Sequence, residues 1–264
     1  QSYPLTDCVI ELADGDNEAD DANPPPAPHS VTATVSAIGQ VSRSLWAVTI
    51  RLDEQLEFIP GQYLEVSVPG QHDITRTFSV ASPQQWLPEV QLVIKKIEDG
   101  EFSRLLGPDL VGKQLAITGP FGSMRYRPSP RPTLLVGAGS GIAPLMSILR
   151  TVSIADSFSA ASIRLFYCAR QRADIPFVEE LAAMAKRIPC LDVHITLSQP
   201  SNLDGWEGHT GRLVPLLARE YRDDPDLDAY LCGPPGLCDD VRLLLEARGT
   251  PPKQIWADAF YPAC

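Results

Sequence analysis

The chain has 264 residues, 44% of them hydrophobic, so it can bury one large core or two ordinary ones. Its formal net charge of −11 argues against binding to nucleic acid or to an anionic membrane surface. No apolar run approaches the length of a membrane span, and the first residues lack the pattern of a signal peptide.

The cysteines show neither a CxxC pair nor a metal-ligand spacing, so we expect no metal site. They are Cys8, Cys168, Cys190, Cys232, Cys238 and Cys264. Cys168 and Cys232 end apolar runs, where a reduced thiol behaves as a small hydrophobic side chain. This usage predicts a reducing, cytoplasmic environment. The chain starts with Gln1 rather than Met, which predicts a processed protein or a fragment.

Residues 1–30 predict a short strand-like run followed by a linker. Residues 1–10 end in the run, and residues 11–30 read ELADGDNEADDANPPPAPHS. Acidic residues fill the first part of this stretch and prolines the second, which is typical of a solvated, semi-stiff linker. The acidic run could instead dock a basic partner.

The chain from Val31 to Gly119 predicts β structure, because short alternating or apolar runs are separated by Pro-Gly, Asp-Gly and Gly-Pro turns. The expected strands are residues 31–38, 44–52, 62–68, 75–81, 90–97 and 114–118. One short helix is expected at about 101–107. This many short strands favours a closed antiparallel β-barrel.

From Pro132 the pattern changes to alternating strands and helices. Strands are expected at 133–137, 162–167, 191–197, 228–232 and 254–257, and helices at 142–153, 175–187, 212–220 and 236–248. Asp174 and Pro176 are expected to begin the second helix as its N-cap and first-turn residues. The order predicts an α/β, Rossmann-like, doubly wound parallel sheet, with ligands beyond the carboxyl ends of its strands.

A glycine-rich turn joins the first strand and helix of this half. Gly137, Gly139 and Gly141 follow a buried apolar run and precede a helix with Pro144 near its start. Glycines permit positive φ and leave room for a ligand, and the first amides of a helix attract anions. The turn therefore predicts a dinucleotide phosphate site, although a glycine-rich turn without a ligand would read the same way.

Two segments of the barrel half suit a phosphate-bearing aromatic ligand. Arg76 offers a planar fork of donors for a diphosphate, and Phe78 points to the same face and could cover a ring system. Ser79 alternates to the other face and would need a kink to reach the same ligand. Gly100 to Ser103 open the short helix with a second possible anion site, to which Lys95 could add charge. The alternative is an edge strand with an exposed arginine and a core phenylalanine.

An ordered set of motifs resembles the ferredoxin–NADP⁺ reductase-like flavoproteins. The motifs are RTFS at 76–79, GEFS at 100–103, GPFG at 119–122, GAGSGIAP at 137–144, YCAR at 167–170, CGPPG at 232–236 and ADAFYP at 257–262. Each is weak alone, but their order and spacing over residues 31–264 are specific. The resemblance implies an FAD-binding barrel, an NAD(P)-binding Rossmann-like domain and an NAD(P)H-dependent oxidoreductase.

The resemblance also implies roles for residues. Arg76 and Ser103 would hold the FAD diphosphate, Phe78 would lie against the isoalloxazine, and Ser79 would bond near flavin N5. Ser140 would approach the nicotinamide, and Cys232 would lie near nicotinamide C4, unless it is simply a buried thiol. The expected catalytic residues are Ser79, Cys232 and Asp258. The expected cofactor-binding residues are Arg76, Thr77, Phe78, Ser79, Ile94, Lys95, Gly100, Phe102, Ser103, Gly139, Ser140, Gly141, Arg170, Cys232, Gly233, Pro234 and Phe260.

Two features of the site stay open. Phe260 or Tyr261 could face the flavin and would have to shape or vacate that face for hydride transfer. NADH is expected rather than NADPH, because residues 198–202 hold no Arg or Lys to meet a 2′-phosphate. Arg170 and Arg172 keep NADPH possible, unless they pair with Asp174.

The N-terminal residues QSYPLTDCVIEL resemble the segment after the last cluster cysteine of plant-type [2Fe–2S] domains, whose ligands this chain lacks. An ordinary tail is the alternative. The resemblance implies the reductase component of a bacterial multicomponent oxygenase without its N-terminal [2Fe–2S] domain. It would use FAD and NADH and serve an oxygenase or ferredoxin component. The alternatives are a stand-alone flavin reductase and a non-catalytic electron-transfer or regulatory subunit. Expected domains are 1–30 (remnant and linker), 31–128 (FAD) and 129–264 (NAD(P)).

Overall fold

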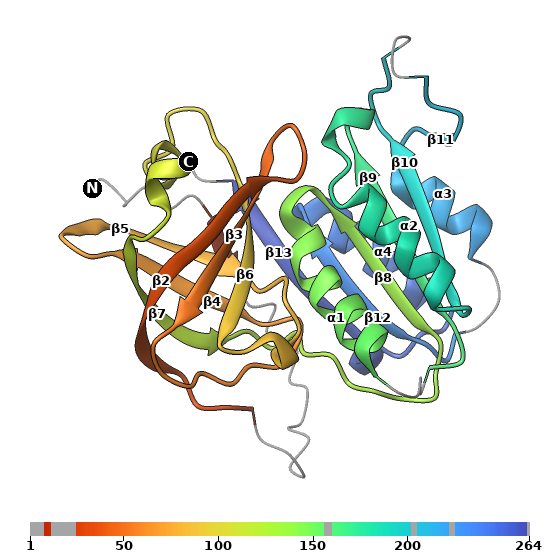
Figure 1. Cartoon of the computed structure of the whole chain (residues 1–264). Helices are drawn as coiled ribbons and strands as arrows, with labels where there is room; N and C mark the ends of the chain where they lie inside the picture. The colour runs from red at the N-terminus through yellow and green to blue at the C-terminus, as the bar shows by residue number, and fades with distance from the viewer. Residues whose placement is uncertain (1–7, 12–24, 156–159, 202–204, 222–224, 263–264) are drawn as a thin grey trace, which may run out of the picture.

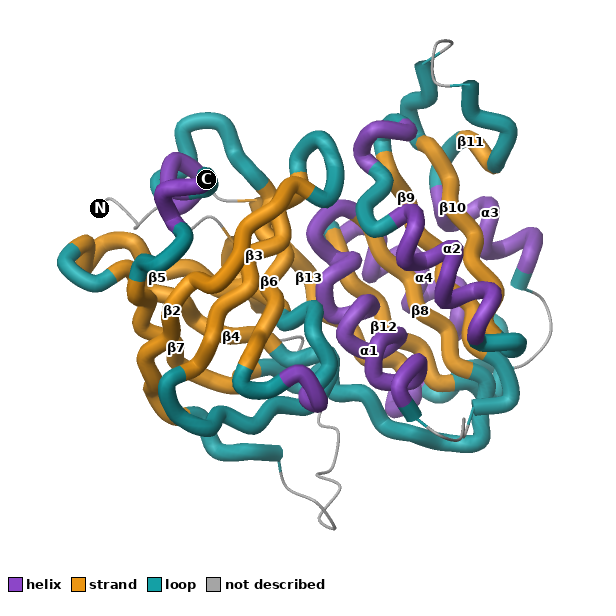
Figure 2. The backbone as a smooth tube through the Cα atoms, in the orientation of Figure 1, coloured by secondary structure: helices purple, strands orange, loops and turns teal. Residues whose placement is uncertain are grey.

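The computed structural model describes residues 8–11, 25–155, 160–201, 205–221 and 225–262, and their strands form two sheets (Figures 1 and 2). A six-stranded antiparallel sheet lies beside a seven-stranded, mostly parallel sheet that carries the helices. Residues 12–24, which contain most of the predicted acidic linker, lie outside the described residues. The change of pattern predicted at Pro132 separates the two sheets.

Every strand predicted for the barrel half is present. They are β2 (His29–Gln40), β3 (Leu45–Leu52), β4 (Tyr63–Val68), β5 (Gln71–Ser79), β6 (Glu89–Lys95) and β7 (Gln114–Phe121), in the spatial order β5-β4-β7-β2-β3-β6. A further bridge, between Val80 and Leu92, joins the chain after β5 to β6 and curls the sheet toward closure. The short helix is a 3₁₀ turn, Phe102–Leu105, rather than the longer helix expected.

The strands predicted after Pro132 all lie in the second sheet. Its full spatial order is β1-β13-β12-β8-β9-β10-β11. They are β8 (Thr133–Ala138), β9 (Ile163–Ala169), β10 (Leu191–Leu197), β12 (Asp228–Gly233) and β13 (Ile255–Pro262), with a short β11 (His209–Thr210) at one edge. The helices are α1 (Ile142–Ile154), α2 (Val178–Arg187), α3 (Leu213–Glu220) and α4 (Pro235–Ala247). α1 and α2 contribute to one hydrophobic core and α3 and α4 to another. The helices therefore cover both faces, as a doubly wound sheet requires.

The N-terminal strand β1 (Cys8–Glu11) joins this second sheet rather than the barrel. It runs antiparallel to β13, with Ile10 opposite Phe260 and Glu11 opposite Ala259. The strand-like run at the N-terminus was expected, but its partner was not. β13 also continues to Pro262, well past the predicted end at 257, because β1 and β12 pair with it on both sides.

The predicted start of the second helix is wrong. α2 begins at Val178, after Phe177 in the left-handed region with φ 53°. Asp174 instead closes a separate 3₁₀ turn, Arg172–Asp174, where its carboxylate accepts the amide proton of Gln171. The side chain that was expected to cap the helix is therefore committed to the turn that precedes it.

The glycine-rich turn has the predicted place but not the predicted backbone. Of its glycines only Gly139 has a positive φ, +58°. A Cβ on Gly141 would lie 2.2 Å from the carbonyl oxygen of Cys232, and one on Gly137 would lie 2.7 Å from Leu145 Cδ1. Gly137 and Gly141 are therefore required because the turn packs against β12 and α1, and Gly139 alone needs the conformational freedom.

A buried arginine joins the two halves of the molecule. Arg150 of α1 is 4% exposed, and its Nη1 donates to the Ala81 carbonyl at 3.0 Å and to Gln91 Oε1 at 2.7 Å, both in the barrel half. Its Nε and Nη2 pair with the carboxylate of Glu180 in α2 at 2.7 and 2.8 Å. One guanidinium thus connects the barrel to helices on the same face of the parallel sheet.

Neighbouring contacts reinforce this joint. The Trp86 and Phe177 rings lie 4.9 and 5.0 Å from the guanidinium carbon of Arg150. The hydroxyl of Ser147, one turn earlier in α1, donates to the Ser82 carbonyl at 2.6 Å. The barrel residues Leu45 and Val93 also belong to the core that α1 fills. Polar and apolar contacts together hold the halves in one arrangement.

We expect Arg150→Ala to lower the free energy of unfolding by about 3 kcal/mol, because it removes a buried cation and leaves several acceptors unpaired. Urea denaturation measures this change. The matched control is Arg219→Ala, which removes an exposed arginine paired with Glu220 and should cost about 1 kcal/mol or less. Equal losses in the two variants would contradict a special role for Arg150.

Candidate functional site

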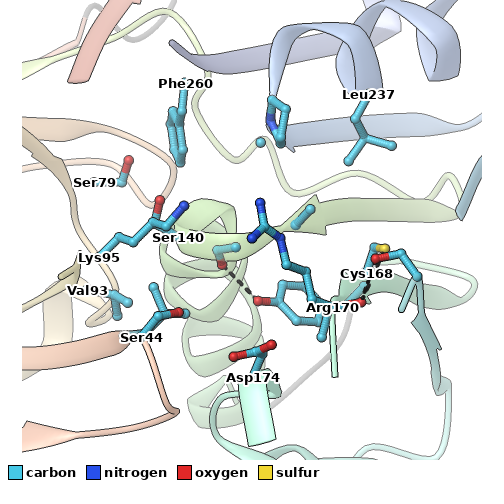
Figure 3. Close-up of a pocket in the computed structure, with 18 of the residues that line it drawn as sticks. Ser44, Ser79, Val93, Lys95, Ser140, Cys168, Arg170, Asp174, Leu237 and Phe260 are labelled. Carbon is cyan, nitrogen blue, oxygen red and sulfur yellow. Dashed lines mark hydrogen bonds between the residues drawn. The ribbon is translucent and has the colours of Figure 1, made fainter. Parts of the chain in front are cut away.

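A cavity of about 790 Å³ lies between the barrel and the parallel sheet. This volume is in the range of small-molecule and cofactor sites. Its walls include Ala138, Ala169 and Gly233, the last residues of β8, β9 and β12. The cavity therefore lies beyond the carboxyl ends of the parallel strands, where ligands were expected. Figure 3 shows Ser79, Val93 and Lys95 of the barrel facing Ser140 and Arg170 of the other half.

The structure brings most of the predicted site residues to this one cavity. From the barrel these are Thr77, Phe78, Ser79, Ile94, Lys95, Phe102 and Ser103. From the second half they are Gly139, Ser140, Arg170, Gly233, Pro234 and Phe260. Segments separated by more than a hundred residues of sequence thus meet at one site, in agreement with the motif set.

The barrel side of the cavity combines aromatic rings with hydroxyl groups. Phe78 and Phe102 pack edge to face, with ring centroids 4.8 Å apart, and both line the cavity. Thr77, Phe78 and Ser79 are successive residues that all line the cavity. Ser79 is the last residue of β5 and pairs in regular register with Tyr63 of β4, so it reaches the cavity at the strand end without the kink that was expected there.

The predicted phosphate-binding group lies next to this wall. Ser103 lines the cavity, and its hydroxyl accepts the amide proton of Ile97 at 2.9 Å, which leaves its own proton to be donated. Arg76 and Gly100 are not part of the wall. Arg76 is 3% exposed; its Nη1 donates to the Thr75 carbonyl at 2.8 Å and its Nη2 to Glu101 Oε2 at 2.9 Å.

The remaining predicted residues lie behind the cavity. Gly141 packs against β12, and Cys232 is 0% exposed with its Sγ 3.4 Å from Met124 Sδ. Burial raises the pKa of the Cys232 thiol well above its ordinary value, so this thiol stays protonated at neutral pH. The alternative interpretation, a buried strand-end thiol, describes the position of Cys232. A role at nicotinamide C4 stays a prediction.

Asp258 is a buried acid beside that thiol. It lies on β13 opposite Cys232 of β12, and its Oδ2 has no hydrogen-bond partner among the described residues. Burial raises the pKa of Asp258 to about 7. The tyrosine Tyr63 of β4 also has a raised pKa, first through its own burial and then through the Asp258 charge. Asp258 can therefore hold or release a proton near neutral pH, close to both sheets.

The sequence did not reveal every residue of the cavity wall. Arg43, Ser44, Asp174, Ser198 and Arg212 all contribute to it. Arg43 lies in the turn between β2 and β3, and no motif marks it. Ser198 belongs to the segment 198–202 that was expected to lie near the 2′-position of the coenzyme, whereas only the fold brings Arg43, Ser44 and Arg212 to the cavity.

Arg43 forms a clasp between the two halves at this wall. Its Nε and Nη2 donate to Asp174 Oδ1 and Oδ2 at 2.9 and 2.6 Å, and its Nη1 donates to Gln171 Oε1 at 2.7 Å. Its backbone amide donates to the Ala173 carbonyl at 2.9 Å. From the sequence, the alternative to a coenzyme-binding role for Arg170 and Arg172 is an ion pair with Asp174. In the structure the carboxylate of Asp174 pairs with Arg43. Arg170 is exposed and lines the cavity.

The described residues contain no group of three or more His, Cys, Asp or Glu side chains that could hold a metal ion. Cys168, Cys190, Cys232 and Cys238 are free thiols. Among the helices of the described segments, none is long and apolar enough to cross a membrane.

Family models match both halves of the chain. The oxidoreductase FAD-binding domain matches residues 32–126, and the oxidoreductase NAD-binding domain matches residues 135–243. The reductase component of propane 2-monooxygenase from Mycolicibacterium smegmatis is 31% identical over 270 residues, covering 98% of this chain and 75% of that protein. The ferredoxin–NAD(P)⁺ reductase component of the naphthalene 1,2-dioxygenase/salicylate 5-hydroxylase systems from Ralstonia sp. is 33% identical over 268 residues, covering 100% and 77%.

Solved structures agree with these relatives. The ferredoxin reductase in carbazole 1,9a-dioxygenase superimposes with a TM-score of 0.79 at 26% identity, covering 92% of this chain and 73% of that one. The FAD apo form of that reductase gives a TM-score of 0.70 at 26% identity, covering 89% and 68%.

The raised pKa of Asp258 predicts how stability depends on pH. The unfolded chain loses the Asp258 proton near its ordinary pKa and the folded chain near pH 7, so this group destabilises the fold increasingly as pH rises between those values. We expect Asp258→Asn to raise the free energy of unfolding by about 2 kcal/mol more at pH 8 than at pH 5.

Urea denaturation with saturating FAD at both pH values measures the effect. The control is Asp239→Asn, which removes an exposed carboxylate on α4. A stabilisation by Asp258→Asn that does not grow between pH 5 and pH 8 would show that the buried carboxyl group keeps an ordinary pKa.

Proposed function

The chain belongs to the ferredoxin reductase-like family of FAD- and NAD(P)-binding oxidoreductases, and on that premise we propose that it is the reductase component of a multicomponent oxygenase. It is an NAD(P)H-dependent flavoprotein, and the proposed electron acceptor is a [2Fe–2S] ferredoxin domain or protein. The observation that carries the proposal is the single cavity lined by both domains, with Phe78 and Ser79 on one side and Gly139 and Ser140 on the other. Relatives that serve oxygenases support the proposed partner.

The residues of the barrel side fit FAD. When bound, FAD accepts a hydride from the nicotinamide and passes electrons on singly. Phe78 and Phe102 offer an aromatic surface for the flavin ring, and Ser79 offers a hydroxyl at its edge. Ser103 offers a hydroxyl for a phosphate. Arg76 pairs with Glu101, the residue just before the turn that holds Ser103, so we assign its guanidinium to the same phosphate group.

The residues of the other side fit a dinucleotide. A Cβ on Gly139 would meet nothing within 4 Å, so its positive-φ backbone faces open space at the wall. Ser140, Gly233 and Pro234 continue this surface and would hold the nicotinamide opposite the residues proposed to bind the flavin. Phe260 lines the cavity (Figure 3), and we propose that its ring excludes water from the reaction face.

The predicted catalytic residues divide into two groups. Ser79 lines the cavity, so it is proposed to contact the flavin. Cys232 and Asp258 lie behind the wall, so they are proposed as positioning residues that shape the site and hold a proton near it.

The proposed coenzyme is NADH. Ser198 lines the cavity, and the chain from Ser198 to Ser201 supplies no cation for a 2′-phosphate. Arg170 and Arg212 also line the cavity, and we assign them to the phosphates shared by NADH and NADPH. The proposed setting is the cytoplasm, where the free thiols would stay reduced. The proposed FAD-binding domain spans residues 31–128, and the proposed NAD(P)-binding domain spans residues 129–264.

A visible absorption spectrum of the purified protein, recorded before and after anaerobic NADH, tests the proposal. We expect flavin absorption bands that bleach when NADH is added. We also expect bleaching with NADH to be at least about tenfold faster than with NADPH, because the site lacks a cation to stabilise the 2′-phosphate of NADPH. A colourless protein that turns over NADH only with added free flavin would indicate a stand-alone flavin reductase. Bound flavin that NADH does not reduce would indicate a non-catalytic subunit.

The assignment of Arg76 to FAD has its own test. We expect Arg76→Ala to weaken FAD affinity by about tenfold or more, because an arginine–phosphate contact is lost, while the KM for NADH changes little. Flavin content after gel filtration and NADH kinetics with saturating FAD measure both. The control is Arg104→Ala, which removes an exposed arginine of the 3₁₀ turn that holds Ser103. Equal FAD content in Arg76→Ala and the parent would overturn the assignment.

A further inference from the structure

We propose that Glu101 competes with the FAD diphosphate for Arg76. The Glu101 carboxylate pairs with the arginine, and FAD must displace it in order to bind. Glu101 would thus set the affinity for FAD. This inference rests on the proposed function, in which Arg76 binds FAD.

The ion pair has one fixed and one movable member. Arg76 Nη2 lies 2.9 Å from Glu101 Oε2; the arginine side chain is 3% exposed and that of Glu101 is 49% exposed. A buried guanidinium needs an anionic or polar partner, and removing it from the interior would leave its other acceptor, the Thr75 carbonyl, without that bond. Glu101 can turn into solvent at little cost, whereas Arg76 cannot. The arginine therefore stays and its partner can change.

The position of the pair favours this exchange. Glu101 directly precedes the 3₁₀ turn Phe102–Leu105, whose Ser103 lines the cavity as the predicted phosphate contact. The turn is tightly packed, since a Cβ on Gly100 would lie 3.1 Å from Ser103 Oγ. A diphosphate held by Ser103 and Arg76 would come next to the Glu101 carboxylate. The negative charges of the diphosphate and the carboxylate would then repel each other strongly, because water is partly excluded there.

The competition has two opposite consequences. Without FAD, Glu101 neutralises the buried cation and stabilises the fold. With FAD, the same carboxylate repels the diphosphate and reduces its retention. A salt bridge with a purely structural role would have the first consequence but not the second, so the two can be separated by experiment.

The variant Glu101→Gln tests the proposal, because it keeps the side chain's size and acceptor oxygen but removes its charge. We expect the Kd for FAD to fall by about tenfold, because a like-charge contact is removed. Fluorescence titration of the FAD-depleted protein measures the Kd. Diluting the holoenzyme and following released flavin fluorescence gives a second readout, in which release should be slower. The FAD-depleted variant should also melt at a lower temperature than the parent.

Two controls isolate the diphosphate. Glu98→Gln makes the same change of net charge at an exposed side chain three residues earlier. Riboflavin has the same ring but no phosphate, so Glu101→Gln should leave its Kd unchanged. Tighter FAD binding in Glu101→Gln alone, and not for riboflavin, would support the competition.

Other outcomes overturn it in distinguishable ways. An unchanged or raised Kd for FAD in Glu101→Gln would overturn the competition. Equal tightening in Glu98→Gln, or equal tightening for riboflavin, would overturn it too, because neither involves contact between Glu101 and the phosphates. If Arg76→Ala also leaves FAD binding intact, the role of Arg76 in the proposed function fails as well; if Arg76→Ala weakens FAD binding, that role stands.

Discussion

The cavity depends on a buried arginine that fixes one sheet against the other. Arg150 reaches from α1 to the Ala81 carbonyl and the Gln91 side chain of the barrel, and its charge is balanced by Glu180. Neither half alone could satisfy this guanidinium. Because an unpaired buried charge is costly, the two halves are held in the arrangement that pairs it. A ring of FAD and a ring of NADH can be stacked only if the surfaces that bind them keep a fixed separation.

Each half contributes to the cavity what its architecture makes easy. The parallel sheet presents the ends of β8, β9 and β12 with glycines at Gly139 and Gly233, so main chain and ligand can approach closely. The barrel presents the end of β5, where both Phe78 and Ser79 line the cavity. Arg43 connects these surfaces a second time through Asp174 and Gln171. The site is therefore a property of the joint between the halves.

Local patterns predicted most of the elements, because strands, helices and turns leave a periodic record in the sequence. The same patterns failed where a side chain answers to a distant partner. Asp174 looked like a helix cap but pairs with Arg43, 131 residues away along the chain. The strand-like N-terminal run gave no sign that it would pair with β13. Cys232 matched a motif, yet its thiol faces Met124 rather than the cavity, which only the packing of β12 decides.

Two carboxyl groups make the site sensitive to charge in opposite ways. Asp258 is buried with one oxygen lacking a hydrogen-bond partner among the described residues, and its burial favours the protonated form. Glu101 is half exposed and forms an ion pair with Arg76. A negative ligand at the barrel turn is opposed by Glu101, whereas Asp258, on the other side, can hold or release a proton near neutral pH. The proposed FAD site therefore combines an arginine that is already paired with a carboxylate and, behind the cavity wall, an acid that titrates near neutral pH.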